Sequence, residues 1–90
     1  MQRYYMNIVD TGEVHKDPEG SSHSNDAEAI REATAAAREM VAEHVRFGLE
    51  VGIQRINVVD QAGRPVATVR LRDQIKLGPD ASEPETNPLT

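Results

Sequence analysis

Four side chains that could bind a divalent metal lie close together near the N-terminus: His15, Asp17, Glu19 and His23. Imidazole and carboxylate groups are common ligands of such metals. Their spacing, however, imposes neither tetrahedral nor octahedral geometry, and Asp17-Pro18-Glu19-Gly20 has the composition of a surface turn. We interpret these groups as solvated side chains of a loop, and we predict no metal site and no cofactor.

A second group combines Tyr5 with Arg55, Arg70 and Arg72. An aromatic ring beside arginines on an open sheet face binds single-stranded RNA by stacking and by phosphate contacts. The chain offers one such ring and carries a formal net charge of −5, whereas binding to nucleic acid needs clustered positive charge. Nucleic-acid binding through the Arg55/Arg70 face is therefore the alternative function.

Three aspartates, Asp10, Asp60 and Asp73, end predicted strands. Aspartates at such positions usually accept hydrogen bonds from nearby backbone amides, so we interpret them as turn residues. The sequence has no Gly-x-Ser-x-Gly elbow, no phosphate-binding loop, no His-Glu-x-x-His and no cysteine nucleophile. We expect no enzymatic activity, no catalytic residues and no small-molecule substrate.

Charge is unevenly distributed along the 90 residues. Residues 1–50 carry ten acidic and five basic side chains, residues 51–77 carry two and five, and residues 78–90 carry three acidic ones. The absence of cysteine and of an apolar N-terminal segment predicts a cytoplasmic protein that is neither exported by a signal peptide nor inserted in a membrane.

The elements that must position these side chains are organised around one amphipathic helix, predicted from Asn25 to about Phe47. Asn25 is the expected N-cap, with Glu28 placed to complete a capping box, and Gly48 or Gly52 is expected to end the helix. His44 falls inside the apolar stripe, where we expect one ring nitrogen to bond to the backbone or to water. The predicted stripe consists of Ile30, Ala33, Thr34, Ala37, Met40, Val41, His44 and Val45.

Two pairs of strands flank this helix. Residues 3–10 alternate with Tyr4, Met6 and Ile8 toward the core, and residues 13–15 are predicted to form a short returning strand before a polar loop at 21–24. Residues 53–60 and 64–71 form a second hairpin around Gly63. Its core-facing side chains are predicted to be Ile56, Val58, Ala67, Val69 and Leu71.

Together these elements predict an α+β fold of β-β-α-β-β order, a two-layer sandwich with a four-stranded, mainly antiparallel sheet. Residues 1–75 would form one small domain, and residues 76–90 a disordered acidic tail. One helix covers only one face of such a sheet. The other face would carry the exposed candidate interaction residues Tyr5, Val9, Arg55, Val59, Val66 and Arg70.

The chain resembles a bacterial family of short proteins catalogued as a domain of unknown function. The resemblance rests on Arg3-Tyr4-Tyr5-Met6-Asn7-Ile8, Asp17-Pro18-Glu19-Gly20, the alanine-rich helix, Ile56-Asn57-Val58-Val59-Asp60, Gly63 and Val69-Arg70-Leu71-Arg72-Asp73. This sequence has His23 where the family has an apolar residue before the helix, and Leu71 where it has an aromatic one. The missing apolar residue removes a hydrophobic staple, which leaves the packing of the loop at 21–24 open.

In outline, the order of elements is also similar to that of HicB-type antitoxin domains, which block a small basic toxin. The residues themselves favour association as the function, because a half-covered sheet leaves an apolar patch or an unpaired edge exposed. We therefore predict a non-catalytic module that binds another protein or associates with itself, for example as a homodimer. Nucleic-acid binding or an antitoxin-like regulatory role is the alternative.

Overall fold

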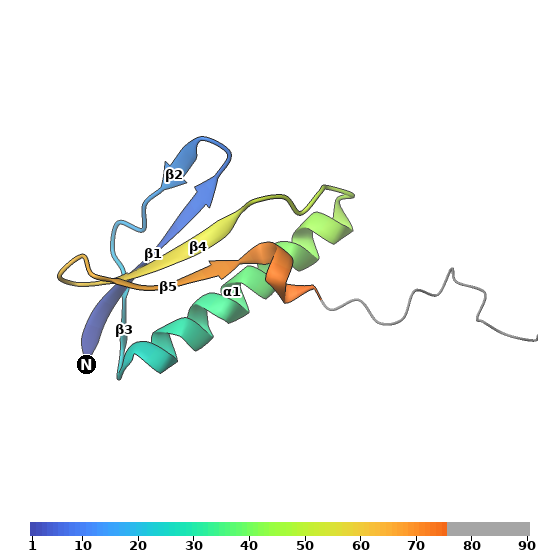
Figure 1. Cartoon of the computed structure of the whole chain (residues 1–90). Helices are drawn as coiled ribbons and strands as arrows, with labels where there is room; N and C mark the ends of the chain where they lie inside the picture. Colours follow the sequence, from blue (N-terminus) through green and yellow to red (C-terminus); the bar gives the residue numbers. More distant parts are fainter. Residues whose placement is uncertain (76–90) are drawn as a thin grey trace, which may run out of the picture.

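The computed structural model describes residues 1–75, which form five strands, one α-helix and one short 3-10 helix (Figure 1). The predicted α+β class with a single helix is confirmed. The predicted acidic tail, residues 76–90, lies outside the described residues. The elements are β1 (Gln2–Asp10), β2 (Glu13–His15), β3 (Ser21–His23), α1 (Asp26–Arg46), β4 (Arg55–Asp60), β5 (Pro65–Arg70) and η1 (Leu71–Gln74).

The sheet is antiparallel throughout, with the order β2-β1-β4-β5. Strand β4 pairs with one side of β1, while β2 and β3 both pair with the other side, at opposite ends of β1. The four predicted strands are therefore present, and β3 is a fifth. Its residues were expected to form a polar loop, because serine-rich segments have low strand propensity. Pairing with β1 supplies the hydrogen bonds that the local sequence does not predict.

Helix α1 begins and ends as its capping residues require. The Asn25 side chain accepts a 2.9 Å hydrogen bond from the Glu28 amide, and the Glu28 carboxylate accepts one of 2.8 Å from the Ser24 amide. At the other end Gly48 has a φ of +69°, its amide bonds to the Val45 carbonyl, and the Leu49 amide bonds to that of His44. This is a Schellman arrangement, so Gly48 is the terminating glycine.

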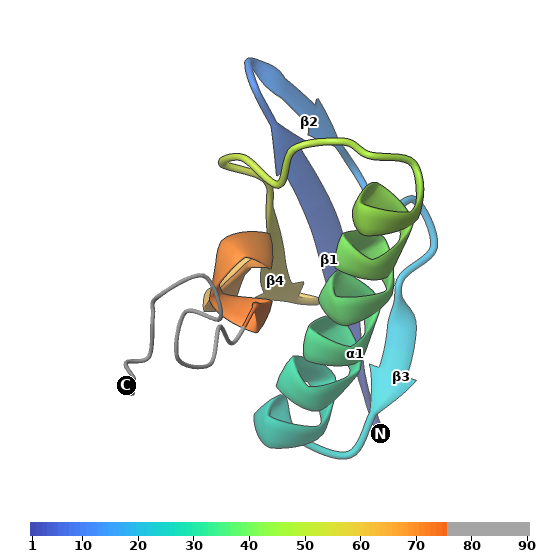
Figure 2. The same cartoon turned by 90° about the vertical axis from the view of Figure 1, so that its right-hand side faces the viewer.

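The helix lies against one face of the sheet (Figure 2), and the side chains that make the contact are mainly alanines. Ala29, Ala33 and Ala37 are completely buried, and Ala36, Met40 and Val41 pack partly against the same core. The observed contact face is centred one position before the predicted stripe, so Ile30 is only half-buried. The prediction that Val45 belongs to the stripe is wrong, because Val45 is 69% exposed. Small side chains let the helix approach closely, so the alanine face is selected over the face with larger side chains.

The core facing the helix is built from the side chains that alternation placed there. Tyr4, Ile56, Val58 and Leu71 are the largest fully buried side chains, and Val69 is 7% exposed. Met6 and Ile8 pack against them while remaining partly exposed. Within residues 1–75, no helix has the length and apolar character needed to cross a membrane.

Candidate functional site

The sheet face away from α1 carries three cross-strand rows of side chains. Register and alternation place Tyr5 beside Val59 and Pro65, Asn7 beside Asn57 and Thr68, and Val14 beside Val9, Arg55 and Arg70. The Thr68 hydroxyl donates a 3.2 Å hydrogen bond to Asn57 Oδ1 across the strands. We call this surface the open face. It has an aliphatic and aromatic end at Tyr5 and a basic end at Arg55, with a polar row between them.

Two of the predicted interaction residues are not exposed on this face. Val66 packs partly against the helix-side core, because the register shifts between Val58 and Val59 and an extra residue of β5 is accommodated there. Val9 does point away from the helix, but only 8% of it is exposed. The predictions of an open-face position for Val66 and of an exposed Val9 are therefore wrong. Tyr5, Val59 and Arg55 are partly exposed on the face, and Arg70 is exposed.

Tyr5 is half-buried because its ring lies over Gly20. A Cβ atom on Gly20 would lie 2.9 Å from the Tyr5 ring and 2.6 Å from the Tyr4 carbonyl oxygen, and Gly20 has a φ of +72°. Only glycine permits this approach. The turn is also fixed by Asp17, which accepts hydrogen bonds from the amides of Met6 and Gly20.

The basic end of the open face forms a hollow of about 270 Å³. Three arginines, Arg55, Arg70 and Arg72, line it, and the other lining residues are Gly52, Ile53, Gln54 and Thr68. Arg55 and Arg70 occupy directly paired positions on β4 and β5. The Leu71 amide extends this pairing with a 3.1 Å bond to the Gln54 carbonyl, which brings Arg72 close to the same end.

Two carboxylates lie at the border of this hollow. Asp73 approaches Arg70 at 4.0 Å, with both side chains about 60% exposed. Asp10 accepts a 3.2 Å bond from Gln54 Nε2, and a bond from the Thr11 amide, followed by the one from Gln54, holds the pKa of Asp10 below its usual value. The hollow itself is lined by positive and neutral groups only.

A further surface was missed by the sequence analysis. The end of α1 and the segment leading to β4 expose four large apolar side chains, namely Val45, Phe47, Leu49 and Ile53, each between 57% and 69% exposed. Between them Val51 packs against the core. The available signal was the spacing of apolar residues at positions 47, 49, 51 and 53, which resembles the alternation of a strand, but of these four side chains only Val51 packs against the core. We call the four exposed side chains, Val45, Phe47, Leu49 and Ile53, the apolar end patch.

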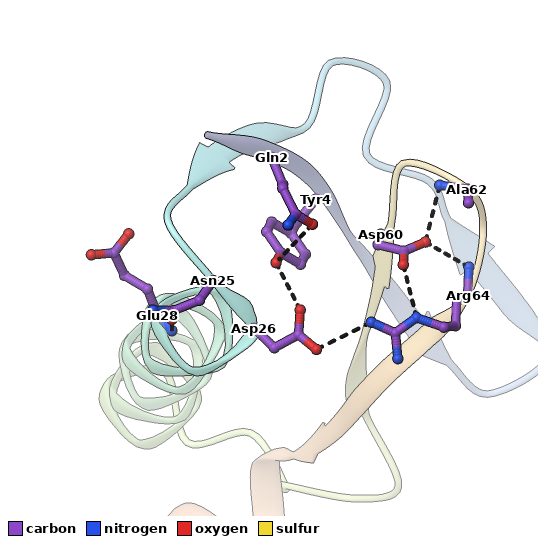
Figure 3. A network of polar contacts seen from close by, with 8 residues as sticks. All are labelled: Gln2, Tyr4, Asn25, Asp26, Glu28, Asp60, Ala62 and Arg64. Atoms are coloured by element: carbon purple, nitrogen blue, oxygen red, sulfur yellow. Dashed lines mark hydrogen bonds and ion pairs between the residues drawn. The ribbon is translucent and has the colours of Figure 1, made fainter.

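A polar network joins the start of α1 to two parts of the sheet (Figure 3). Asp26 accepts hydrogen bonds from the Tyr4 hydroxyl at 2.7 Å and from Arg64 Nη2 at 3.1 Å. Arg64 Nε also bonds to Asp60 at 2.9 Å, and Asp60 accepts bonds from the backbone amides of Ala62 and Arg64. The network was not predicted, except that Asp60 has the expected role of a turn residue.

The network shifts the pKa values of its members. The hydrogen bond from the Tyr4 hydroxyl is the largest cause of the lowered pKa of Asp26, and the bond from Arg64 is the next. The bond between Tyr4 and Asp26 is also the largest cause of the raised pKa of Tyr4. The backbone bond from Arg64 is the main cause of the lowered pKa of Asp60. The carboxylates of Asp26 and Asp60 are both paired with the guanidinium of Arg64. The network therefore stabilises the fold and offers no free acid or base.

The histidines have local structural partners. His23 is 9% exposed, its ring centroid lies 5.8 Å from that of Tyr4, and Nε2 lies 2.8 Å from the Ser21 hydroxyl. His23 therefore packs against Tyr4, at the position where the resemblance implies an apolar residue. His44 Nδ1 bonds to the Met40 carbonyl at 2.7 Å, as expected. Within residues 1–75, no three histidine, aspartate or glutamate side chains are grouped as a metal site.

Comparison with known proteins identifies one family. The family model described as "Domain of unknown function (DUF6894)" matches residues 3–72. The resemblance to a family of unknown function is thus confirmed over nearly all the described residues. No curated protein and no solved structure gives a significant match.

Proposed function

The chain belongs to the DUF6894 family of domains of unknown function, and from this premise we propose that it is a non-catalytic module that associates reversibly with a second copy of itself. The interface would combine the apolar end patch with the adjoining end of the open face. We also propose a bacterial cytoplasm as its location, consistent with the cysteine-free sequence.

The observation that carries this proposal is the exposure of the apolar end patch. Phe47 is 66% exposed, Leu49 59% and Ile53 57%, in a chain that has few large apolar residues. The exposed side chains all come from residues 45–53, and exposed apolar side chains concentrated in one region are typical of interaction sites. Ile53 also lines the hollow beside Arg55, so the patch continues onto the open face.

The sheet edges support association less than the faces do. At one edge, β5 begins with Pro65, contains a register shift and ends with Arg70. At the other, β2 and β3 are three residues long, and between them Asp17 accepts the hydrogen bond of the Met6 amide. Proline, bulges, short strands and charge all disfavour pairing of an edge with another strand.

Size limits the strength of the proposed interface. Three strands about 4.8 Å apart and about six residues long give an open face of about 300 Å². Stable complexes bury about 800 Å² on each partner, so the open face alone is too small for a tight dimer. Adding the apolar end patch enlarges the contact, and we expect a weak, concentration-dependent dimer.

A second copy is the partner that the charge distribution favours. Residues 1–50 have an excess of five acidic side chains, and residues 51–77 an excess of three basic ones. Each chain therefore offers both signs of charge to an identical neighbour. Complementary charge steers association and selects the relative orientation of the partners.

Sedimentation velocity from micromolar to millimolar concentration tests this function. We expect the average mass of the wild type to rise with concentration, and Leu49→Glu and Ile53→Glu to reduce the association constant at least tenfold. Ala35→Glu introduces the same charge on the exposed side of α1 and should change nothing. A wild-type chain that stays monomeric throughout, or an Ala35→Glu effect equal to the other two, would contradict the proposal.

The alternative, nucleic-acid binding, is supported by the location of Tyr5, Arg55 and Arg70 on one face. Tyr5 and Arg55 lie at opposite ends of that face, with the polar row between them. A single-stranded oligonucleotide titrated at low salt should then be bound more weakly by both Tyr5→Ser and Arg55→Gln. Binding that is absent at low salt, where phosphate contacts are strongest, removes this alternative.

A further inference from the structure

We propose that the hollow at the basic end of the open face is a binding site for a terminal phosphate group, the dianionic end of a phosphomonoester. The hollow adjoins the proposed interface through Ile53, but the inference rests only on the lining of the hollow within one chain and is tested on the monomer. The residues that carry it are Arg55, Arg70 and Arg72.

The pairing of two arginines is the first argument. Arg55 and Arg70 are directly opposite each other on neighbouring antiparallel strands. Side chains at such positions have Cβ atoms about 5 Å apart, and like charges there destabilise a sheet. An anion between the two guanidinium groups would convert this repulsion into attraction, so the arrangement favours a bound negative group.

The balance of charge around the hollow is the second argument. Among residues 1–75, Arg70 has one carboxylate within 4.0 Å, that of Asp73, while Arg55 and Arg72 have none. Asp10 reaches the wall of the hollow only through Gln54. Three guanidinium groups line the hollow, whereas two carboxylates lie at its border and only that of Asp73 contacts an arginine, so an excess of positive charge remains for a bound anion.

Size and donor geometry specify the group further. A volume of about 270 Å³ is slightly below the usual range of ligand pockets, so the hollow accommodates one polar group with a short attached moiety. The planar guanidinium presents paired N–H donors that match the oxygens of phosphate. Ile53 and Thr68 line the hollow as well, and the apolar side chain of Ile53 would contact the carbon attached to the ester oxygen.

Nuclear magnetic resonance titration of the ¹⁵N-labelled full chain tests the site, with inorganic phosphate as the probe and acetate as the comparison at constant ionic strength. We expect saturable shifts at residues 52–55 and 68–72, with phosphate bound at least tenfold more tightly than acetate. Equal effects of the two anions, or shifts spread over all arginines, would overturn the proposal.

Matched variants locate the binding. Arg55→Gln and Arg70→Gln should each weaken phosphate binding at least fivefold, whereas Asp73→Asn should strengthen it about twofold to threefold by releasing Arg70. Arg38→Gln removes the same charge from the exposed side of α1 and should have no effect. All four positions are at least partly exposed, so the variants are expected to fold, and equal losses in Arg38→Gln and Arg55→Gln would refute a localised site.

The source of the phosphate is resolved by three further probes: glycerol phosphate, a short 5′-phosphorylated oligonucleotide and its 5′-hydroxyl counterpart. Tighter binding of the phosphorylated than of the hydroxyl oligonucleotide supports a terminal phosphate, and its affinity relative to glycerol phosphate assigns a nucleic-acid or a small-molecule source. Equal binding of the two oligonucleotides would overturn the proposal, because it would indicate contacts to the internal backbone. Measurements at concentrations where the chain sediments as a monomer keep this result separate from self-association.

Discussion

The Tyr4 hydroxyl donates a 2.7 Å hydrogen bond to Asp26 Oδ1, which joins two residues 22 positions apart. The bond connects β1 to the first turn of α1, and Arg64 extends the connection to the β4–β5 hairpin. Gln2 Oε1 lies 3.4 Å from the same hydroxyl, but the single proton is directed to the nearer, charged acceptor. Three segments that are distant in sequence are therefore held at one point.

Removing this hydroxyl should destabilise the fold. In Tyr4→Phe the buried ring remains and Asp26 loses the donor that contributes most to its lowered pKa, so we expect a lower urea midpoint with an unchanged slope. Tyr5→Phe is the matched control, since no described residue bonds the Tyr5 hydroxyl. Equal midpoints for the two variants would show that the bond contributes nothing to stability.

The lowered carboxyl pKa values predict a loss of stability in acid. Asp10, Asp26 and Asp60 have pKa values below the ordinary 3.8, and Glu28 below 4.5, so the unfolded chain binds more protons as the pH falls. Their stabilising contribution is complete above those ordinary values and is lost as the pH passes through the folded values. Urea unfolding between pH 7 and pH 2.5 should show the loss of stability steepening below about pH 4.5. Asp26→Asn should make this acid dependence shallower.

The raised pKa of Tyr4 has the opposite sign of dependence. Its contribution is complete below the ordinary pKa of 10.0 and is lost as the pH rises through the higher folded value. Unfolding measured above pH 10 should therefore reveal an alkaline loss of stability that Tyr4→Phe reduces. An identical alkaline profile in the variant would contradict this assignment.

Two glycines with similar backbone angles allow strain and close contact to be separated. Gly12 has a φ of +73° and nothing within 4 Å of an added Cβ, whereas at Gly20 that atom would lie 2.6 Å from the Tyr4 carbonyl oxygen. We expect Gly12→Ala to cost about 1–2 kcal/mol from the left-handed backbone alone. Gly20→Ala should cost at least about 1 kcal/mol more, because the β1 edge must move. Denaturant unfolding compares them, and equal values would mean that the turn relaxes freely.

Leu71 in η1 is expected to be a major core residue. It is completely buried and belongs to the core cluster that α1 covers. Leu71→Ala should lower the free energy of unfolding by about 2–5 kcal/mol, the usual range for a cavity of this kind. Ile75→Ala, at a side chain 39% exposed, is the control and should cost clearly less. A larger loss of stability in Ile75→Ala than in Leu71→Ala would contradict the assignment of Leu71 to the core.

The sequence predicted those features that depend on neighbouring residues. Periodicity located α1, its capping residues and both main hairpins, and alternation placed Ile56 and Val58 in the core and Arg55 with Arg70 on the opposite face. These patterns involve residues that are close together in the chain, so they can be recognised from a single sequence. The presence of arginines at the basic end was therefore predictable, although the hollow that they line was not.

Features that depend on distant contacts were not predictable. Strand β3 exists because β1 offers it hydrogen bonds, and Val66 turns inward because of a register shift set by the whole hairpin. The Asp26–Arg64 pair joins residues 38 positions apart, with no motif to indicate it. The exposure of Phe47, Leu49 and Ile53 depends on the three-dimensional path between α1 and β4, which periodicity does not specify.

The contact face of α1 is made of alanines, and this restricts how the helix can be seated. Ala29, Ala33 and Ala37 have no rotamers to freeze or rearrange, so their docking carries almost no side-chain entropy penalty and offers no means of adjustment. Rotating the helix by one position would bring Ile30, Thr34 and Arg38 against the strands, where their volume does not fit. Only one rotation of the helix about its own axis therefore fits the sheet, and the smallest side chains of the core determine it.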